Sequence, residues 1–217
     1  MIYFNACEIV LFLVSSIKHF IKKVHKKSFF ANPNIVICVP SGATNVERRA
    51  IKESAETAGA KKVYLIEEPV AAAIGAGLPI SEASGSMVVD IGGGTTEIAV
   101  IALAGIVCEK SLKVAGDVLT NDIVYYMRTK HNLYIGDRTA EKIKIEVGSV
   151  TESLDDPPED MHVQGRDLLS GKPKEKVISY IEVAKAIDKS IIRIEDSIME
   201  TLSQTPQELA ADIYNTG

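Results

Sequence analysis

The chain has 217 residues, which suggests one large domain or two small ones, since a domain averages about 150 residues. Hydrophobic residues make up 46% and charged residues 24%, which excludes a wholly disordered chain because enough apolar material is present to bury a core. The net charge of −5 provides no overall basic field for nucleic acid, so no nucleic-acid partner is expected.

The cysteines and histidines do not suggest a disulfide scaffold or a metal site. Cys7, Cys38 and Cys108 are odd in number and form no C-x-x-C motif, which favours a protein of the reducing cytosol. The histidines match no H-E-x-x-H or similar ligand pattern.

The N-terminal segment predicts an amphipathic helix over residues 9–24, because its apolar residues recur at three- and four-residue spacing. The apolar run 9–17 is about half the length needed to span a bilayer. Glu8 precedes this run where a signal peptide would carry basic residues, which argues against one. Two interpretations of the basic end, Lys22–Lys27, stay open: the solvated end of a core-facing helix, or a contact with a membrane surface.

A first strand and helix follow. The apolar residues 35–39, IVICV, predict a buried parallel strand that ends at Pro40. Thr44 and Glu47 have the spacing of a capping box, in which each side chain satisfies a free backbone donor at a helix start. Gly59 suits the left-handed end of that helix.

The next strand is predicted over residues 61–68, with a helix that has Pro69 at its first position. This order predicts a mostly parallel sheet with helices packed on it. From Ser86 the hydrophobic period changes. The strand 87–91, a triple-glycine turn and the strand 97–103 predict a hairpin.

The remaining elements alternate between helices and strands. Gly105 falls in a second turn, and Ser179 with Glu182 forms a second capping box before a long helix. The apolar face of that helix is predicted to comprise Ala184, Ile187, Ile191, Ile194, Ile198 and Leu202. Thr205, Pro206 and Glu208 are predicted to be the N-cap, first and third positions of a last helix. The other expected elements are a strand at 106–114, helices at 115–130 and 137–147, a polar loop at 149–160, and strands at 161–165 and 174–179.

The most informative segment is MVVDIGGGTTEIAV, residues 87–100. An apolar strand leads to Asp90, and the turn Gly92, Gly93 and Gly94 is followed by Thr95 and Thr96. Three glycines let backbone N–H groups approach an anion that a Cβ would obstruct. The threonine hydroxyls could add hydrogen bonds to phosphate, and Asp90 could hold a magnesium-bound water.

The alternative is a glycine-rich hairpin that binds no ligand. A hairpin needs one or two glycines for positive φ, whereas this turn has three, with an acid before them and two hydroxyls after. Other phosphate motifs are absent: there is no G-x-x-x-x-G-K-[ST], and Glu97 stands where a Rossmann turn has its last glycine.

The motif DIGGGTTE resembles the second phosphate loop of the superfamily of actin, heat-shock ATPases and sugar kinases. The segment LIEEPVAAAIGAGLP at 65–79 resembles the interdomain helix of the MreB family of bacterial actin-like cell-shape proteins. The resemblance covers about residues 9–217. Four further segments match that family in the same order: VPSGATNVERRAI (39–51), AGD (115–117), IGDRTAEKIKIEVGS (135–149) and TPQELAADI (205–213).

This resemblance implies an α/β fold of the actin-like ATPase (ribonuclease H-like) type with two domains, truncated at both ends. The expected first domain is 1–114 and the second 115–217, with 150–180 as a peripheral subdomain. The implied function is a cytoskeletal protein that binds ATP and Mg²⁺, forms a homopolymeric filament and determines rod cell shape. It would lie in the cytoplasm, peripheral at the inner face of the cell membrane, in contact with morphogenesis proteins.

The resemblance also implies roles for individual residues. Glu68 would orient the attacking water, which needs a fixed acceptor to become an in-line nucleophile. Two alternatives are a helix N-terminal acid favoured by the macrodipole, and Glu67 in the same role. Asp90 would stand on the metal side, and Lys144 and Glu146 on the adenosine side unless they form an exposed charged face. The remaining implied nucleotide contacts are Gly92, Gly93, Gly94, Thr95, Thr96, Gly116 and Asp117.

Two parts of the family pattern are missing from the sequence. Residues 1–8 contain no glycine and cannot form the family's first phosphate loop, and the adenine-side turn after residues 205–213 is not reached. We therefore expect impaired ATP hydrolysis and exposed apolar sheet faces. Two other functions remain open: a non-catalytic subunit that docks on or caps filaments, and, less favoured, a sugar kinase or another superfamily ATPase.

Overall fold

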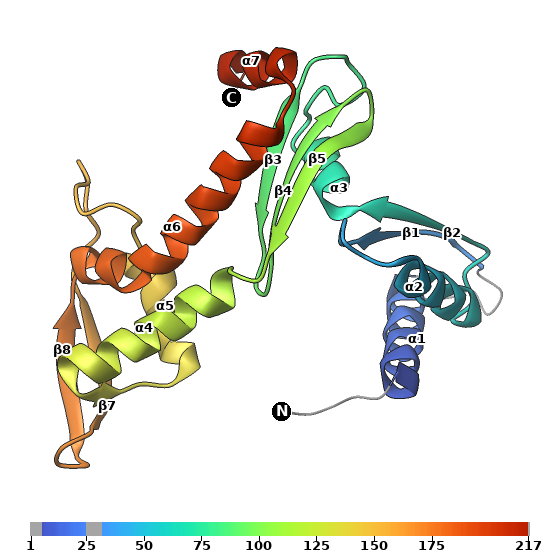
Figure 1. Ribbon diagram of the computed structural model, residues 1–217. Helices are drawn as coiled ribbons and strands as arrows, with labels where there is room; N and C mark the ends of the chain where they lie inside the picture. Colours follow the sequence, from blue (N-terminus) through green and yellow to red (C-terminus); the bar gives the residue numbers. More distant parts are fainter. Residues whose placement is uncertain (1–5, 25–31, 217) are drawn as a thin grey trace.

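The computed structural model describes residues 6–24 and 32–216, and Figure 1 shows how their elements are arranged. His25, Lys26 and Lys27, which belong to the predicted basic helix end, lie outside the described residues. Among the helices of the described part, none combines the length and the apolarity needed to cross a membrane.

The first part of the chain forms a small parallel sheet flanked by helices (Figure 1). It comprises α1 (Ala6–Val24), β1 (Asn34–Val39), α2 (Asn45–Thr57) and β2 (Lys62–Glu67). β1 and β2 pair in parallel, as predicted. The capping box of Thr44 and Glu47 is confirmed, and Gly59 has the expected positive φ of 110°. One face of this sheet is open, with Val36 64% and Tyr64 52% exposed.

The central part is an antiparallel sheet in the order β3-β4-β5. Its strands are β3 (Ser86–Ile91), β4 (Thr96–Ala102) and β5 (Gly105–Leu112), and α3 (Glu68–Gly75) precedes them. α3 begins one residue before the predicted Pro69. Every residue of β4 is buried, because α3 and α6 (Tyr180–Gln204) both pack against this strand.

The prediction of a mostly parallel sheet was wrong beyond β1 and β2. Within the described residues the other two sheets are antiparallel. The reason is the connection: short turns join β3 to β4 and β4 to β5, and a parallel pair would need a crossover of a dozen or more residues. The predicted hairpin at the triple glycine is confirmed.

The last part packs three helices, α4, α5 and α6, and a small sheet around the main hydrophobic core. Ile123, Met127, Leu133 and Ile143 are fully buried there. The 137–147 helix is confirmed at its predicted bounds. The elements are α4 (Gly116–His131), β6 (Leu133–Tyr134), α5 (Asp137–Val147), β7 (Met161–Asp167), β8 (Pro173–Ile178), α6 and α7 (Gln207–Thr216).

The long helix α6 differs from its prediction in which face it buries. Its capping box at Ser179 is confirmed. Of the predicted apolar face, Ala184, Ile187 and Ile194 are buried. Ile191, Ile198 and Leu202 are half-buried, and the buried stripe includes hydroxyl residues, among them Ser197 and Thr201. Their hydroxyls donate to the carbonyl oxygens of Arg193 and Ser197 one turn back. Such bonds satisfy the polar group inside the helix, so it can be buried at little cost.

The last helix also begins differently from its prediction. α7 begins at Gln207, and Thr205 ends α6, where its hydroxyl donates to the Thr201 carbonyl oxygen at 2.9 Å. Gly85 packs against α7: its N–H donates to the Asp212 carboxylate at 3.0 Å, and a Cβ at position 85 would stand 2.9 Å from Leu209 Cβ. The α7 helix is thereby fixed to the start of β3.

The packing also bears on the domain boundary. β4 and β5 pack against α6, and β3 packs against α7, so the three-stranded sheet associates with the C-terminal half of the chain. α3 contacts both this sheet and the β1–β2 sheet. We therefore propose that the two domains meet at α3 instead of between residues 114 and 115.

Candidate functional site

The candidate site lies at the end of the central sheet where β3 turns into β4. The Gly92 N–H donates to the Thr95 carbonyl oxygen at 3.0 Å and closes this turn. None of Gly92, Gly93 and Gly94 has positive φ, since the positive-φ glycines of the described residues are Gly59, Gly77 and Gly171. The turn therefore does not require glycine for its backbone conformation, which was the reason that the alternative of a ligand-free hairpin would have given.

Clearance for an anion, the reason predicted from the sequence, agrees with the space around this turn. A Cβ at Gly94 would meet no heavy atom within 4 Å, and one at Gly93 would meet only the Asp117 carboxylate at 3.6 Å or more. The space beside the Cα atoms at these two positions is therefore open or nearly open. Bare peptide groups of this kind let an anion approach the backbone N–H donors closely.

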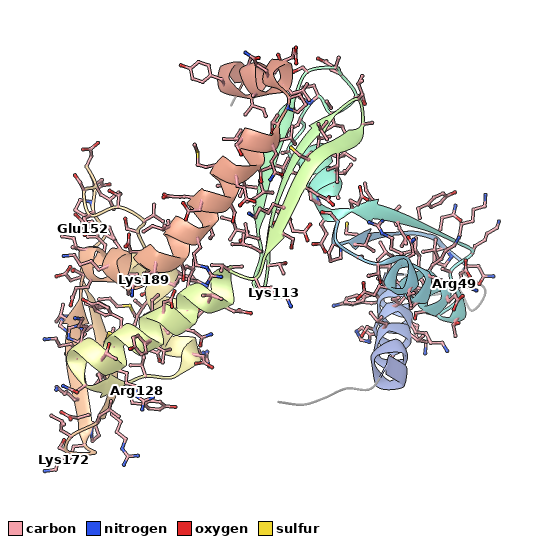
Figure 2. All side chains as sticks on the ribbon, in the orientation of Figure 1. Arg49, Lys113, Arg128, Glu152, Lys172 and Lys189 are labelled. Atoms are coloured by element: carbon pink, nitrogen blue, oxygen red, sulfur yellow. The ribbon has the colours of Figure 1, made fainter. Side chains whose placement is uncertain are left out.

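The start of α4 is bonded directly to the turn. The Gly116 N–H donates to the Gly92 carbonyl oxygen at 3.0 Å, and the Asp117 N–H donates to that of Gly93 at 2.8 Å. The structure thus brings the two predicted segments together. Figure 2 shows Lys113 at the same end of the sheet, where β5 leads into α4.

The two threonines after the turn differ in accessibility. Thr96 is fully buried, and its hydroxyl donates to the Val114 carbonyl oxygen at 2.6 Å. Its proton is therefore committed inside the protein, which corrects the expectation that both hydroxyls could bond a phosphate. Thr95 is half-buried and remains a candidate for that contact.

Lys144 joins α5 to the start of α4. Its Nζ donates to the Gly116 carbonyl oxygen and to Thr120 Oγ1, each at 3.0 Å, and lies 2.7 Å from Glu141 Oε2. Hydrogen bonds from Lys144 and Thr120 lower the pKa of Glu141. A hollow of about 510 Å³ opens beside this group, lined by Asp117, Thr120, Asn121, Asp137, Arg138 and Glu141.

Glu146 does not join this group. It is exposed and lies 3.7 Å from Lys142 on another face of α5. Two residues correspond to about 200° around a helix, so Lys144 and Glu146 point in nearly opposite directions. Sequence reasoning missed Glu141, although three residues separate it from Lys144, which is the spacing that places side chains together on one helix face.

Three acids gather on the other side of the turn. Glu68 is the first residue of α3, and Asp90 pairs across the β3–β4 ladder with Glu97. Partial burial, and then the charges of Glu97 and Asp90, raise the pKa of Glu68. Glu97 was another residue that sequence reasoning did not select. A single acid within the apolar run of β4 was the available signal.

The raised pKa of Glu68 predicts a pH-dependent effect of Glu68→Gln. Folding stabilises the protonated carboxyl, so this contribution is complete below the ordinary glutamate pKa and is lost as pH rises through the raised value. We expect Glu68→Gln to unfold at a higher temperature than wild type at pH 7, with the difference vanishing at acidic pH. Thermal unfolding at several pH values measures this, with the exposed Glu109→Gln as control. A difference that does not change with pH would contradict it.

The residues present fit a magnesium ion held through water. Asp90 offers a half-buried carboxylate beside the turn, and magnesium prefers oxygen ligands while retaining part of its water shell. No group of three or more His, Cys, Asp or Glu residues in the described part could hold a metal ion. Asp90 alone would therefore leave most ligand positions to water and substrate oxygens.

The α/β arrangement, with a glycine turn bonded to a helix start, is that of a protein of actin-like fold. The family model "MreB/Mbl protein" matches residues 11–217. The chain belongs to the MreB/Mbl family.

Named relatives agree with this assignment. The cell shape-determining protein MreB of Escherichia coli (strain K12) is 50% identical over 202 residues, which are 93% of this chain and 58% of that protein. The cell shape-determining protein Mbl of Bacillus subtilis (strain 168) is 47% identical over 201 residues, which are 93% of this chain and 60% of that protein.

Among solved structures, the crystal structure of MreB5 of Spiroplasma citri bound to ADP superposes with a TM-score of 0.88 at 37% identity. The match covers 96% of this chain and 62% of that one. The predicted actin-like α/β fold is thus confirmed. The chain spans about three fifths of the length of the relatives it matches.

Proposed function

We propose that this chain binds ATP with Mg²⁺ at the Gly92–Gly94 turn and acts in a filament-forming protein that determines rod cell shape. The observation that carries the proposal is the turn itself. Its three glycines avoid positive φ, one faces open space, and its carbonyl oxygens accept from the first N–H groups of α4. A relative of similar fold was crystallised with ADP, which supports a nucleotide as the ligand.

Each part of the site has a proposed role. Backbone N–H groups of the turn would donate to phosphate oxygens. Asp90 would hold Mg²⁺ through water, and the ion would neutralise negative charge on the phosphates. Glu68 would accept a hydrogen bond from the attacking water. The hollow beside Thr120, Glu141 and Lys144 would take the nucleoside end, where acceptor oxygens suit hydroxyl donors.

The location and hydrolysis rate are part of the proposal. The filament would lie in the cytoplasm at the inner membrane face, together with morphogenesis proteins, as its membership of a family of cell shape-determining proteins suggests. Hydrolysis by this chain alone would be slow. Phosphate catalysis relies on several pre-placed donors that converge on one anion. In the described part of the chain, the turn is approached by the start of α4 and by the acids Glu68, Asp90 and Glu97, which is an incomplete set of such donors.

A matched pair of lysines on α5 tests the nucleotide site. Lys144 bonds to Gly116 and Thr120, whereas Lys142 lies on an exposed face beside Glu146. Lys144→Met is expected to weaken ATP binding by about tenfold, because the contacts that position the start of α4 and Thr120 beside the turn are lost. Lys142→Met should bind as wild type does. Calorimetric titration with ATP and Mg²⁺ measures both, and equal affinities of the two variants would contradict the proposed site.

A further inference from the structure

A second hollow opens in the last part of the chain, where the connection between β7 and β8 lies beside β6. It has a volume of about 330 Å³ and is lined by Tyr134, Arg166, Asp167, Leu168 and Gly171. Tyr134 is 54% exposed and Leu168 is 43% exposed. An aromatic and an aliphatic side chain are therefore accessible in this hollow.

Arg166 gives the hollow a positive charge that is available to a partner. Its Nε donates to the Gly171 carbonyl oxygen at 3.2 Å, and its two terminal nitrogens bond to no described residue. A guanidinium carries several N–H donors in a planar fork that matches a carboxylate. Most of these donors remain free to bind an acid.

The acid that lines the hollow does not neutralise Arg166. Asp167 Oδ1 accepts from the Leu169 N–H at 2.8 Å, and Lys174 Nζ lies 3.0 Å from its other oxygen. The Leu169 N–H, then Lys174, lower the pKa of Asp167. This carboxylate is therefore ionised and already committed to its own turn.

Further cations surround the hollow. Lys172 lies at the free end of the β7–β8 hairpin, where Figure 2 labels it. Arg128 and Lys130 belong to the last turn of α4, which packs against β6. All three side chains are exposed. Together with Arg166 they form a cationic rim around an apolar hollow, which complements an acidic segment that carries an apolar side chain.

The chain itself contains such a segment. Residues 149–160 include five acids and no basic residue. Leu154 is 37% exposed and directly precedes Asp155 and Asp156. Lys185 pairs with Glu152 at 3.5 Å, whereas no described residue forms an ion pair with either aspartate. The two aspartates are therefore available to cations of another molecule.

The acidic segment and the hollow lie at opposite ends of the same part of the molecule. Figure 2 shows this separation by its labels for Glu152 and Lys172. The Tyr180 hydroxyl donates to the Glu152 carbonyl oxygen at 3.3 Å, and the Thr151 N–H donates to Ser149 Oγ at 3.1 Å. These bonds order the start of the segment in advance, which lowers the entropy cost of docking.

We propose that the hollow receives Leu154 from a second copy of this chain, while the two aspartates that follow it contact the cationic rim. The inference deepens the proposed function and rests on it, because it names a contact between copies in the filament. A second copy is the occupant because one chain carries both surfaces, with opposite charge, at opposite ends. Contacts between unlike surfaces of identical chains repeat into open chains instead of closing as dimers.

A peptide of residues 149–160 tests the hollow on the full chain. Fluorescence anisotropy at low salt should show saturable binding that Arg166→Glu weakens by at least about tenfold, since like charges then face each other. Lys172→Glu, which keeps the Arg166 bond to the hairpin, should weaken it in the same direction. Arg49→Glu makes the same change of charge on α2, and Figure 2 shows Arg49 far from the hairpin, so the affinity should not change.

Three results would overturn the assignment of the hollow. They are no binding of the peptide to the wild-type chain, equal affinities of the Arg166→Glu and Arg49→Glu variants, and unchanged affinity of a peptide that carries Leu154→Ser. The serine peptide keeps every acid, so it separates docking of the apolar side chain from attraction between charges alone.

Exchange of charge decides whether the occupant is a second copy. In sedimentation velocity, self-association should weaken when Arg166 and Lys172 become glutamate, and also when Asp155 and Asp156 become arginine. A chain that carries all four changes should associate as wild type does. Peptide binding without this rescue would assign the hollow to an acidic partner of another kind and overturn the inference.

The proposed function is tested separately from this contact. Titration with ATP does not involve either surface, so the charge variants should bind ATP as wild type does. A wild-type chain that binds no ATP would contradict the proposed function, while the peptide affinity and the exchange of charge would still decide the contact between copies.

Discussion

Replacing Gly94 with valine is expected to weaken ATP binding by about 100-fold while the chain stays folded. A Cβ at this position meets no protein atom within 4 Å, so the side chain would occupy space that the proposed phosphate uses. Loss of two charge-assisted hydrogen bonds of about 1.5 kcal/mol each corresponds to that factor. Calorimetric titration with ATP and Mg²⁺ gives the affinity, and thermal unfolding checks that the variant is folded.

Gly75→Val provides the matched control for this experiment. Gly75 also lacks positive φ and has open space around its missing Cβ, but it lies at the end of α3, away from the turn. The affinity of the Gly75→Val variant for ATP should equal that of wild type. If Gly94→Val bound ATP normally, the nucleotide would not contact the turn, and the assignment of Gly92–Gly94 would be wrong.

Replacing Gly165 with alanine is expected to destabilise the chain by about 3 kcal/mol, at the upper end of the usual cost of overpacking. An added Cβ would stand 2.5 Å from the Tyr134 carbonyl oxygen and 2.9 Å from Leu133 Cγ. These atoms belong to the short strand β6, which pairs with β7 and joins the main core. Relief would therefore require a backbone shift beside fully buried side chains.

Denaturant unfolding measures this effect as a lower midpoint with an unchanged slope. Gly75→Ala serves as the control, because a helical glycine with open space becomes slightly more stable as alanine, by about 0.4–1 kcal/mol. A Gly165→Ala variant as stable as wild type would show that β6 and β7 can separate without loss. That result would contradict the close packing described for this sheet.

Local signals predicted the elements well because their causes are local. Both capping boxes, at Thr44 and at Ser179, formed as the spacing of their residues predicts. The triple-glycine hairpin also formed, since two apolar runs separated by a short turn pair with each other. In these cases the residues that determine the structure lie within a few positions of one another.

The site was harder to predict because its contacts join distant segments. The hydroxyl of Thr96 donates to the carbonyl oxygen of Val114, which is 18 residues away. The hydroxyl of Ser41 donates to the carboxylate of Glu97, which is 56 residues away. Glu146 was expected beside Lys144, but the rotation of α5 directs it elsewhere. No pattern in a single segment reveals such pairings. Gly116 and Asp117 were selected through a resemblance that spans the chain, and the structure bonds them to the turn.

The complete burial of β4 has a consequence for how a ligand would meet the glycine turn. A strand covered on both faces opens only with the whole molecule, so its amide protons belong to the most slowly exchanging class. The turn is continuous with this strand and is bonded to the first residues of α4. The backbone N–H donors of the turn would therefore already be immobile before a phosphate binds. Binding would cost little backbone conformational entropy, so most of the contact free energy would appear as affinity.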